Sequence, residues 1–132
     1  MKIYLDSSAL VKLVHVEPET DALRRYLRRH RTDRFVTSAL SRVEVVRAVL
    51  GGGSEAIQHA RRQLSRLDQI ALDASMLDQA ATLSPDTRLR SLDAVHLAAA
   101  GIVGAELRSL VTYDLRLAEA ALRLGLMVEV PA

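Results

Sequence analysis

Short apolar stretches alternate with amphipathic stretches along the whole chain. The apolar stretches predict strands at 2–5, 34–37, 69–72, 107–112 and 127–130. The amphipathic stretches predict helices at 9–14, 18–31, 39–50, 55–67, 73–83, 92–103 and 114–124. Strands that alternate with helices pair as a parallel sheet, with the helices as crossovers. We therefore expect an α/β fold, with a parallel central sheet of about five short strands flanked by about seven helices.

Capping and breaking residues predict where several helices begin and end. Asp73 and Ser91 are expected N-caps, and Gly125 is expected to stop the helix before it. The tripeptide 84–86, Ser-Pro-Asp, breaks a helix. The run 51–54, Gly-Gly-Gly-Ser, is not a phosphate-binding P-loop, because no strand precedes it and no Lys-Ser/Thr pair follows. We expect that run to be a flexible connector.

Length and composition indicate one globular domain. A chain of 132 residues buries roughly two-thirds of its unfolded surface, and 49% hydrophobic with 26% charged residues is ordinary for a folded domain. Cysteine is absent, which excludes disulfides, zinc-thiolate sites and thiol catalysis. The N-terminus lacks a secretory pattern, and the longest uncharged apolar run, 97–105, is too short to cross a bilayer. We therefore expect a cytoplasmic protein without a membrane span.

The placement of the charges is more informative than their sum. The formal net charge is only +2, but sixteen of the eighteen Lys and Arg residues are arginines, which suit bidentate phosphate contacts. Six of these arginines lie within residues 24–34. Such a run forms either an electropositive stripe for nucleic acid or a solvated helix face.

Two acids directly follow predicted strands. Asp6 comes after the strand at 2–5, and Asp114 comes after the apolar residues 110–113. The carboxyl ends of parallel strands face one crevice, in which ligands bind. Each acid could instead be the N-cap of the helix that follows it. The first interpretation is preferred only because further acids occupy comparable positions.

Two more acids lie on otherwise apolar helices. Glu44 is flanked by valines that we expect to face the core, and Asp93 lies in the first turn of the most apolar predicted helix. Simple exposure is the alternative for Glu44, and support of the helix N-terminus is the alternative for Asp93. The four histidines show no zinc-site spacing. His96 shares the helix face of Asp93 and is either a substrate contact or a hydrogen-bonded core histidine.

Four acids in one crevice require a cation. Two carboxylates about 5 Å apart repel by roughly 3 kcal/mol at an effective dielectric near 20, so without a metal some of them would stay protonated. All-oxygen sites suit Mg²⁺ or Mn²⁺, completed by phosphate oxygens of a substrate. Such ions activate water and stabilise the leaving oxygen in phosphodiester hydrolysis. The acids therefore indicate a metal-dependent nuclease.

Four segments resemble, in order, the motifs of the PIN-domain ribonucleases and, among these, the VapC-type toxins of prokaryotic toxin–antitoxin pairs. They are 5–10 (LDSSAL), 38–44 (SALSRVE), 92–98 (LDAVHLA) and 112–114 (TYD). The chain length agrees as well, and the resemblance covers essentially the whole chain. It implies a single PIN-like domain that spans residues 1–132.

The resemblance implies an endoribonuclease that depends on Mg²⁺ or Mn²⁺ and hydrolyses RNA with a metal-activated water. The implied catalytic and metal-site acids are Asp6, Glu44, Asp93 and Asp114, with Ser7 and Thr112 as polar support. Our hypothesis is that Asp6 and Asp93 hold the principal ion directly and that the other two acids complete the site. A homodimer is also implied, as is a cognate antitoxin whose tail enters the active-site groove.

Three arginines are candidates to hold RNA phosphates beside the cleaved bond, namely Arg42, Arg88 and Arg90. Three other functions remain open at this point. One is a PIN-type nuclease that processes RNA without a toxin role. Another is a non-catalytic RNA-binding or protein-interaction module, in which the acids are only helix caps. The third is a metal-dependent phosphatase that acts on a small molecule.

Overall fold

The computed structural model describes residues 1–83 and 89–132, which form five strands and seven α-helices. In chain order the elements are β1 (Lys2–Leu5), α1 (Ser7–Val14), α2 (Thr20–Arg29), β2 (Arg34–Ser38), α3 (Ser41–Ala48), α4 (Gly53–Ser65), β3 (Asp68–Ile70), α5 (Ala74–Ala81), α6 (Ser91–Val103), β4 (Leu107–Val111), α7 (Leu115–Arg123) and β5 (Val128–Glu129). Short 3₁₀ turns, Leu50–Gly52 and Gly104–Glu106, precede α4 and β4. The predicted α/β architecture and its strand and helix numbers are confirmed.

The sheet has the strand order β3-β2-β1-β4-β5, and every neighbouring pair is parallel. The chain first extends the sheet on one side of the central strand β1 and then builds the other side from β4. The strand order therefore reverses between β1 and β4, which is where open parallel sheets form ligand crevices. Leu5 of β1 is paired with Val111 of β4. Asp6 and Thr112, the residues that follow this pair, therefore lie side by side where the two strands end.

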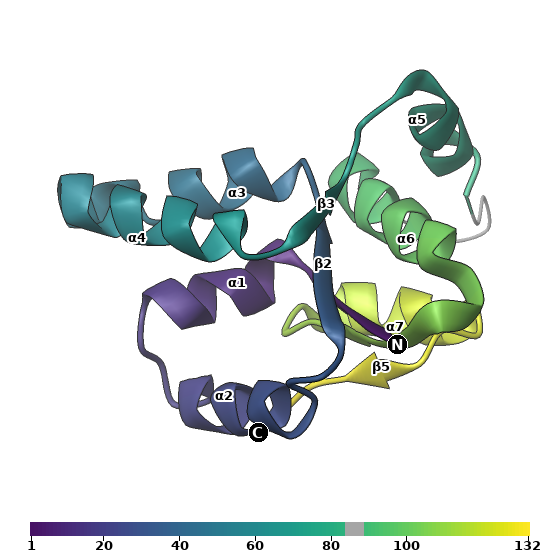
Figure 1. Cartoon of the computed structure of the whole chain (residues 1–132). Helices are drawn as coiled ribbons and strands as arrows, with labels where there is room; N and C mark the ends of the chain where they lie inside the picture. Colours follow the sequence, from purple (N-terminus) through teal and green to yellow (C-terminus); the bar gives the residue numbers. More distant parts are fainter. Residues whose placement is uncertain (84–88) are drawn as a thin grey trace.

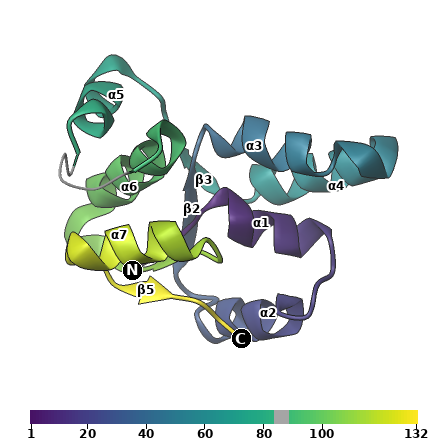
Figure 2. The same cartoon turned by 180° about the vertical axis from the view of Figure 1, so that it is seen from behind.

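Successive residues of β1 supply cores on the two faces of the sheet. Ile3 and Leu5 pack with residues of α1, α2, α3 and α4 in one core, whereas Tyr4 packs with residues of α6 and α7 in the other. This alternation follows from the two-residue period of a strand. Figures 1 and 2 show the result, with α1 and the α3–α4 pair on one side of the sheet and α6 and α7 on the other.

Small side chains allow helix α6 to lie close to its neighbours. Ala99 and Ala100 are buried against the sheet core, while Ala94 and Ala98 pack against α5 in a third, smaller core. Alanine keeps the helix stable and lets another backbone approach it closely. The close approach brings the N-terminal turn of α6, which carries Asp93, to the end of the sheet.

Two predictions at helix ends are wrong. Ser91 is the first residue of α6 and not its N-cap, because Arg90 has the extended backbone of the N-cap position. The run 51–54 is not a connector, since it completes a 3₁₀ turn and already begins α4 at Gly53. Gly53 has a φ of 77°, a left-handed conformation that allows the sharp change of direction between the two helical segments.

Other predicted boundaries agree with the structure. The carboxylate of Asp73 accepts a hydrogen bond of 2.9 Å from the backbone N–H of Met76 and so caps α5. Gly125 follows α7 with a φ of 80° and stops it, as expected. The tripeptide 84–86 lies outside the described residues. In the part of the chain that the structure describes, no helix has the length and hydrophobicity that a membrane crossing requires.

Candidate active site

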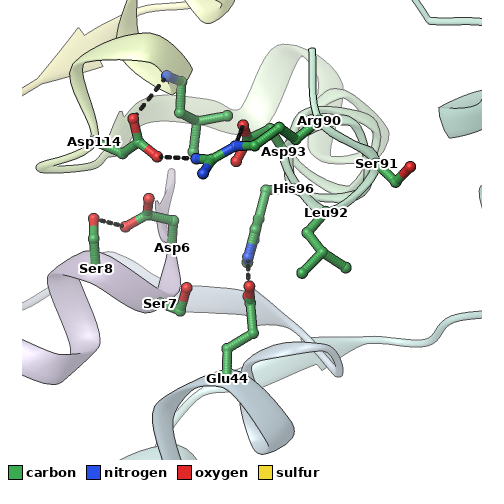
Figure 3. Close-up of a pocket in the computed structure, with 11 residues that line it drawn as sticks. Asp6, Ser7, Ser8, Glu44, Arg90, Ser91, Leu92, Asp93, His96 and Asp114 are labelled. Carbon is green, nitrogen blue, oxygen red and sulfur yellow. Dashed lines mark hydrogen bonds and ion pairs between the residues drawn. The ribbon is translucent and has the colours of Figure 1, made fainter. Parts of the chain in front are cut away.

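A cavity of about 240 Å³ lies at the carboxyl ends of β1 and β4, where the strand order reverses. All four predicted acids line it. The complete lining consists of Asp6, Ser7, Ser8, Glu44, Arg90, Ser91, Leu92, Asp93, His96, Asp114 and Leu117. Figure 3 shows that the acids enter from separate elements and point toward a shared space. The fold thus brings together residues that are far apart in the sequence.

Asp6 is held by three hydrogen bonds. Its Oδ1 accepts from the hydroxyl of Ser8 at 2.7 Å and from the backbone N–H of Ala9 at 3.0 Å, and its Oδ2 accepts from the hydroxyl of Thr112 at 2.5 Å. The bond from Ala9 makes Asp6 the N-cap of α1. The carboxylate is therefore a helix cap and a pocket residue at once, so the two interpretations of Asp6 do not exclude each other.

Burial raises the pKa of Asp6 above its ordinary value, although the hydrogen bonds from Thr112, Ser8 and the Ala9 N–H favour the ionised form. Only 2% of the residue is exposed to solvent. A carboxylate that is surrounded by donors but deprived of water is stabilised strongly by a nearby cation. Asp6 therefore has the environment expected of a metal ligand.

Thr112 links the acids at the ends of β1 and β4. Besides donating to Asp6, its hydroxyl accepts a hydrogen bond of 3.0 Å from the backbone N–H of Asp114. Oδ1 of Asp114 in turn accepts from the N–H groups of Arg116 and Leu117, at 3.0 and 3.4 Å, and caps α7. The second oxygen of Asp114, Oδ2, is directed toward Arg90.

Arg90 joins two of the acids. Its Nε donates to Oδ2 of Asp93 at 3.0 Å, and its Nη2 donates to Oδ2 of Asp114 at 2.9 Å, as Figure 3 shows. The positive guanidinium offsets the repulsion between these carboxylates. The Arg90 side chain is 60% exposed, whereas that of Asp93 is 11% exposed. Arg90 is therefore mostly in contact with solvent, whereas Asp93 is nearly buried.

Glu44 is bonded to His96 from across the pocket. Nε2 of His96 lies 2.6 Å from Oε1 of Glu44, and Nδ1 lies 2.7 Å from the hydroxyl of Tyr4. Burial opposes the ionisation of Glu44, but the hydrogen bond and the charge of His96 hold the pKa of Glu44 below its ordinary value. His96 is thus the hydrogen-bonded core histidine of the two predicted interpretations, and it also lines the pocket.

Only one of the two valines beside Glu44 faces the core, whereas both were predicted to do so. Val45 is buried in the core, as expected, but Val43 is 56% exposed. Consecutive residues of an α-helix point about 100° apart, so both neighbours of one residue cannot face the same core equally. Glu44 lies on the side of α3 that faces the pocket.

Comparison with families of protein domains matches residues 3–122 to the PIN domain. The chain is 52% identical over 131 residues to ribonuclease VapC46 of Mycobacterium tuberculosis, and the alignment covers 98% of both chains. The chain belongs to the PIN-domain family and, within it, to the VapC ribonucleases. The predicted family and the predicted kind of protein, a VapC-type ribonuclease toxin, are therefore confirmed.

Solved structures of VapC-type and other toxin proteins share the fold. VapC20 of Mycobacterium tuberculosis, a toxin that cleaves the sarcin-ricin loop, has a TM-score of 0.72 at 15% identity, over 98% of this chain and 99% of that one. A toxin–antitoxin complex from Klebsiella pneumoniae has a TM-score of 0.67 at 19% identity, over 85% of this chain and 86% of that one. At such low identity the likeness concerns the fold.

PIN-domain VapC nucleases generally depend on a metal ion, and the donors of this pocket fit a hard cation, because they are carboxylate and hydroxyl oxygens. Within residues 1–83 and 89–132, no three acidic or histidine side chains converge closely enough to hold an ion as they now lie. Three contacts already occupy oxygens of these acids. Arg90 occupies oxygens of Asp93 and Asp114, and His96 occupies an oxygen of Glu44.

The remaining predicted residues have different locations. Ser7 lines the pocket with the acids. Arg42 lies instead at a second cavity, beside Val43 and Arg61. Arg90 is in the pocket but contacts carboxylates, and Arg88 lies outside the described residues.

Sequence reasoning missed two supporting residues. Ser8 is not among the predicted site residues, yet its hydroxyl donates to Asp6 and accepts a bond of 2.9 Å from the backbone N–H of Tyr113. Its position two residues after Asp6 was a usable signal. No local sequence signal indicated the bond of Tyr4 to His96, because the residues lie 92 positions apart.

Proposed function

We propose that this VapC-family chain is a metal-dependent endoribonuclease, with Asp6, Glu44, Asp93 and Asp114 as its active-site acids. The observation that carries the proposal is their meeting in a single pocket although they come from β1, α3, α6 and the start of α7. Helix capping alone gives no reason for this meeting. It explains neither Glu44, which lies within α3, nor the lining of one cavity by all four acids.

The proposed ion is Mg²⁺ or Mn²⁺, since both prefer oxygen ligands and retain several waters. Asp6 and Asp93 would hold it directly, because they are the most buried of the four acids and gain most from a nearby cation. Glu44 and Asp114 would complete the site. When bound, the ion supplies activation of a water for attack on the phosphodiester and stabilisation of the leaving oxygen.

The neighbouring side chains orient these acids. Ser8 and Thr112 hold both oxygens of Asp6, and His96 holds Glu44. Arg90, which bonds Asp93 and Asp114, would contact a phosphate of the RNA, for which a guanidinium is well suited. Ser7 would hold a water or a phosphate oxygen at the same rim.

As a VapC-type ribonuclease toxin, the chain is proposed to act on RNA in the cytoplasm. Support comes from membership in the VapC ribonucleases and from the fold shared with a toxin–antitoxin complex. We further propose that the chain forms a homodimer and that a cognate antitoxin inhibits it by inserting a tail into the acidic pocket. Co-expression of a short neighbouring gene should relieve growth arrest caused by this chain.

The test compares variants in which one carboxylate becomes an amide. Asp6→Asn and Asp93→Asn should lose metal-dependent RNA cleavage by at least about a hundredfold while keeping the fold, because Asn is nearly the same size. The matched control is Asp73→Asn, since Asp73 is also an N-cap aspartate but lies on α5, away from the pocket. Asn caps helices as well as Asp does, so the control should cleave like the wild type.

Thermal melting provides a second measurement. Mn²⁺ at a hundredfold excess over its Kd should stabilise the wild type and Asp73→Asn by about 2.7 kcal/mol, and EDTA should reverse the effect. Asp6→Asn and Asp93→Asn should respond much less. Undiminished cleavage by both pocket variants would refute the assignment of the acids. Hydrolysis of a phosphomonoester in place of RNA would favour the phosphatase alternative.

A further inference from the structure

A series of hydrogen bonds leads from the buried sheet core to the pocket. The hydroxyl of Tyr4, on the central strand β1, lies 2.7 Å from Nδ1 of His96 on α6. Nε2 of the same ring lies 2.6 Å from Oε1 of Glu44 on α3, and Figure 3 shows this second contact. Three elements that are distant in sequence are therefore connected through one imidazole ring.

The surroundings of the ring leave it little freedom. Tyr4 is fully buried and His96 is 3% exposed. The two rings meet edge to face, with an interplanar angle of 78° and centroids 5.9 Å apart, a favoured geometry for aromatic pairs. With both ring nitrogens bonded and the ring packed against Tyr4, rotation of His96 would break two hydrogen bonds, one of them fully buried.

The two contacts also determine where the imidazole carries its hydrogen. If Nδ1 accepts from the Tyr4 hydroxyl, a neutral ring has its hydrogen on Nε2, directed at Glu44. A protonated ring has a hydrogen on Nε2 as well. The opposite neutral form would place a lone pair of Nε2 against a carboxylate oxygen at 2.6 Å, which is repulsive. The Nε2 hydrogen is thus donated to Glu44 in both favourable forms.

We propose that Tyr4 is a positioning residue of the nuclease site, which acts through His96 to hold the carboxylate of Glu44 in place. The inference rests on the proposed function, because the orientation of Glu44 affects cleavage only if Glu44 belongs to the active site. Tyr4 itself does not line the pocket. Of its polar contacts, the one with His96 leads to a pocket residue, so the proposed effect passes through the imidazole.

Tyr4→Phe tests the proposal by removing one hydroxyl. The matched control is Tyr26→Phe, because Tyr26 is also buried and its hydroxyl makes a hydrogen bond of the same length, 2.7 Å, to Oγ of Ser109. Groups that orient metal ligands typically contribute 10- to 100-fold to affinity or activity. Tyr4→Phe should lower kcat about tenfold with little change in KM, and weaken Mn²⁺ binding in calorimetry by a similar factor. Tyr26→Phe should match the wild type in its kinetic constants and in its Mn²⁺ affinity.

A double variant distinguishes action through His96 from a general loss of packing. His96→Ala should impair cleavage more than Tyr4→Phe does, because it removes the donor to Glu44 directly. Adding Tyr4→Phe to His96→Ala should then cause no further loss, since the path is already broken. Losses that multiply in the double variant would show that Tyr4 acts independently of His96 and would overturn the proposal.

Nitrogen NMR of the imidazole gives a readout that does not depend on cleavage. The resonances of His96 are identified by their disappearance in His96→Ala. In Tyr4→Phe the Nδ1 and Nε2 shifts of His96 should change, whereas in Tyr26→Phe they should not. Unchanged shifts together with unchanged Mn²⁺ affinity in Tyr4→Phe would refute this inference even in a protein that cleaves RNA. Absence of metal-dependent cleavage by the wild type would instead refute the proposed function.

Discussion

Thr112 donates a hydrogen bond of 2.5 Å to Oδ2 of Asp6, although the two residues are 106 positions apart in the chain. The pairing of Leu5 with Val111 explains the contact, because it sets Asp6 and Thr112 side by side where β1 and β4 end. Thr112 also accepts from the backbone N–H of Asp114. One buried hydroxyl therefore connects two of the pocket acids.

Thr112→Val should destabilise the protein and reduce its activity. Valine has nearly the same shape but leaves Asp6 without one donor and the N–H of Asp114 without its acceptor. Loss of a buried hydrogen-bond partner costs about 1–3 kcal/mol, measurable as a lower free energy of unfolding in urea. Thr112→Ser retains the hydroxyl and should recover most of the stability and cleavage. Equal behaviour of the Val and Ser variants would contradict this role of the hydroxyl.

Asp6→Asn should change the pH dependence of stability in the metal-free protein. The pKa of Asp6 is higher in the folded protein than in the unfolded chain, so the folded protein binds the proton more tightly. The free energy of unfolding therefore falls as Asp6 ionises. This fall begins near the pKa of the unfolded chain, about 4, and is complete above the raised pKa of the folded protein. Asn does not titrate. The Tm of the variant minus that of the wild type should thus increase across this range in EDTA, as followed by circular dichroism, and then level off.

Arg90→Gln should strengthen Mn²⁺ binding. The guanidinium bonds Asp93 and Asp114, so an incoming ion must displace it or bind beside a positive charge. A +1 and a +2 charge about 5 Å apart in water repel by roughly 1.7 kcal/mol, which corresponds to a gain of up to about 20-fold in affinity on removal of Arg90. Arg123→Gln is the control, because Arg123 pairs with Glu119 on the outer side of α7. Calorimetric titration of both variants with Mn²⁺, in the absence of RNA, tests this prediction.

Asp114 allows helix capping to be separated from chemistry. Asp114→Ala removes both the cap of α7 and the acid, and should cost about 0.5–2 kcal/mol of stability. Asp114→Asn keeps a capping oxygen for the N–H groups of Arg116 and Leu117, so its stability should stay close to that of the wild type. Cleavage should nevertheless fall in both variants. A fully active Asp114→Asn would assign this residue to capping alone.

Much of the fold could be predicted from local patterns. Each strand and helix lies within or near its predicted range, because the two-residue and 3.6-residue periods are properties of short segments. One of the two errors at helix ends occurred where a longer-range contact intervened. Arg90, and not Ser91, is the N-cap of α6, and the side chain of Arg90 bonds Asp114, 24 residues away.

The candidate site could be predicted as residue types but not as geometry. The strand-to-helix positions of Asp6 and Asp114 indicated pocket acids and also helix caps, and the structure shows both roles in the same carboxylates. No local pattern contains the contact of His96 with Glu44, 52 positions apart, or that of Tyr4 with His96. Such contacts depend on how α3 and α6 pack around the sheet.

The sequence by itself determined the parallel α/β class and the family, and it predicted the four acids that line the pocket, because periodicity, helix caps and motif order are encoded over short distances. Only the tertiary structure decided which groups touch one another: Thr112 with Asp6, His96 with Glu44, and Arg90 with both Asp93 and Asp114. The physical reason is that strand register and helix packing arise from many weak contacts summed over the whole chain.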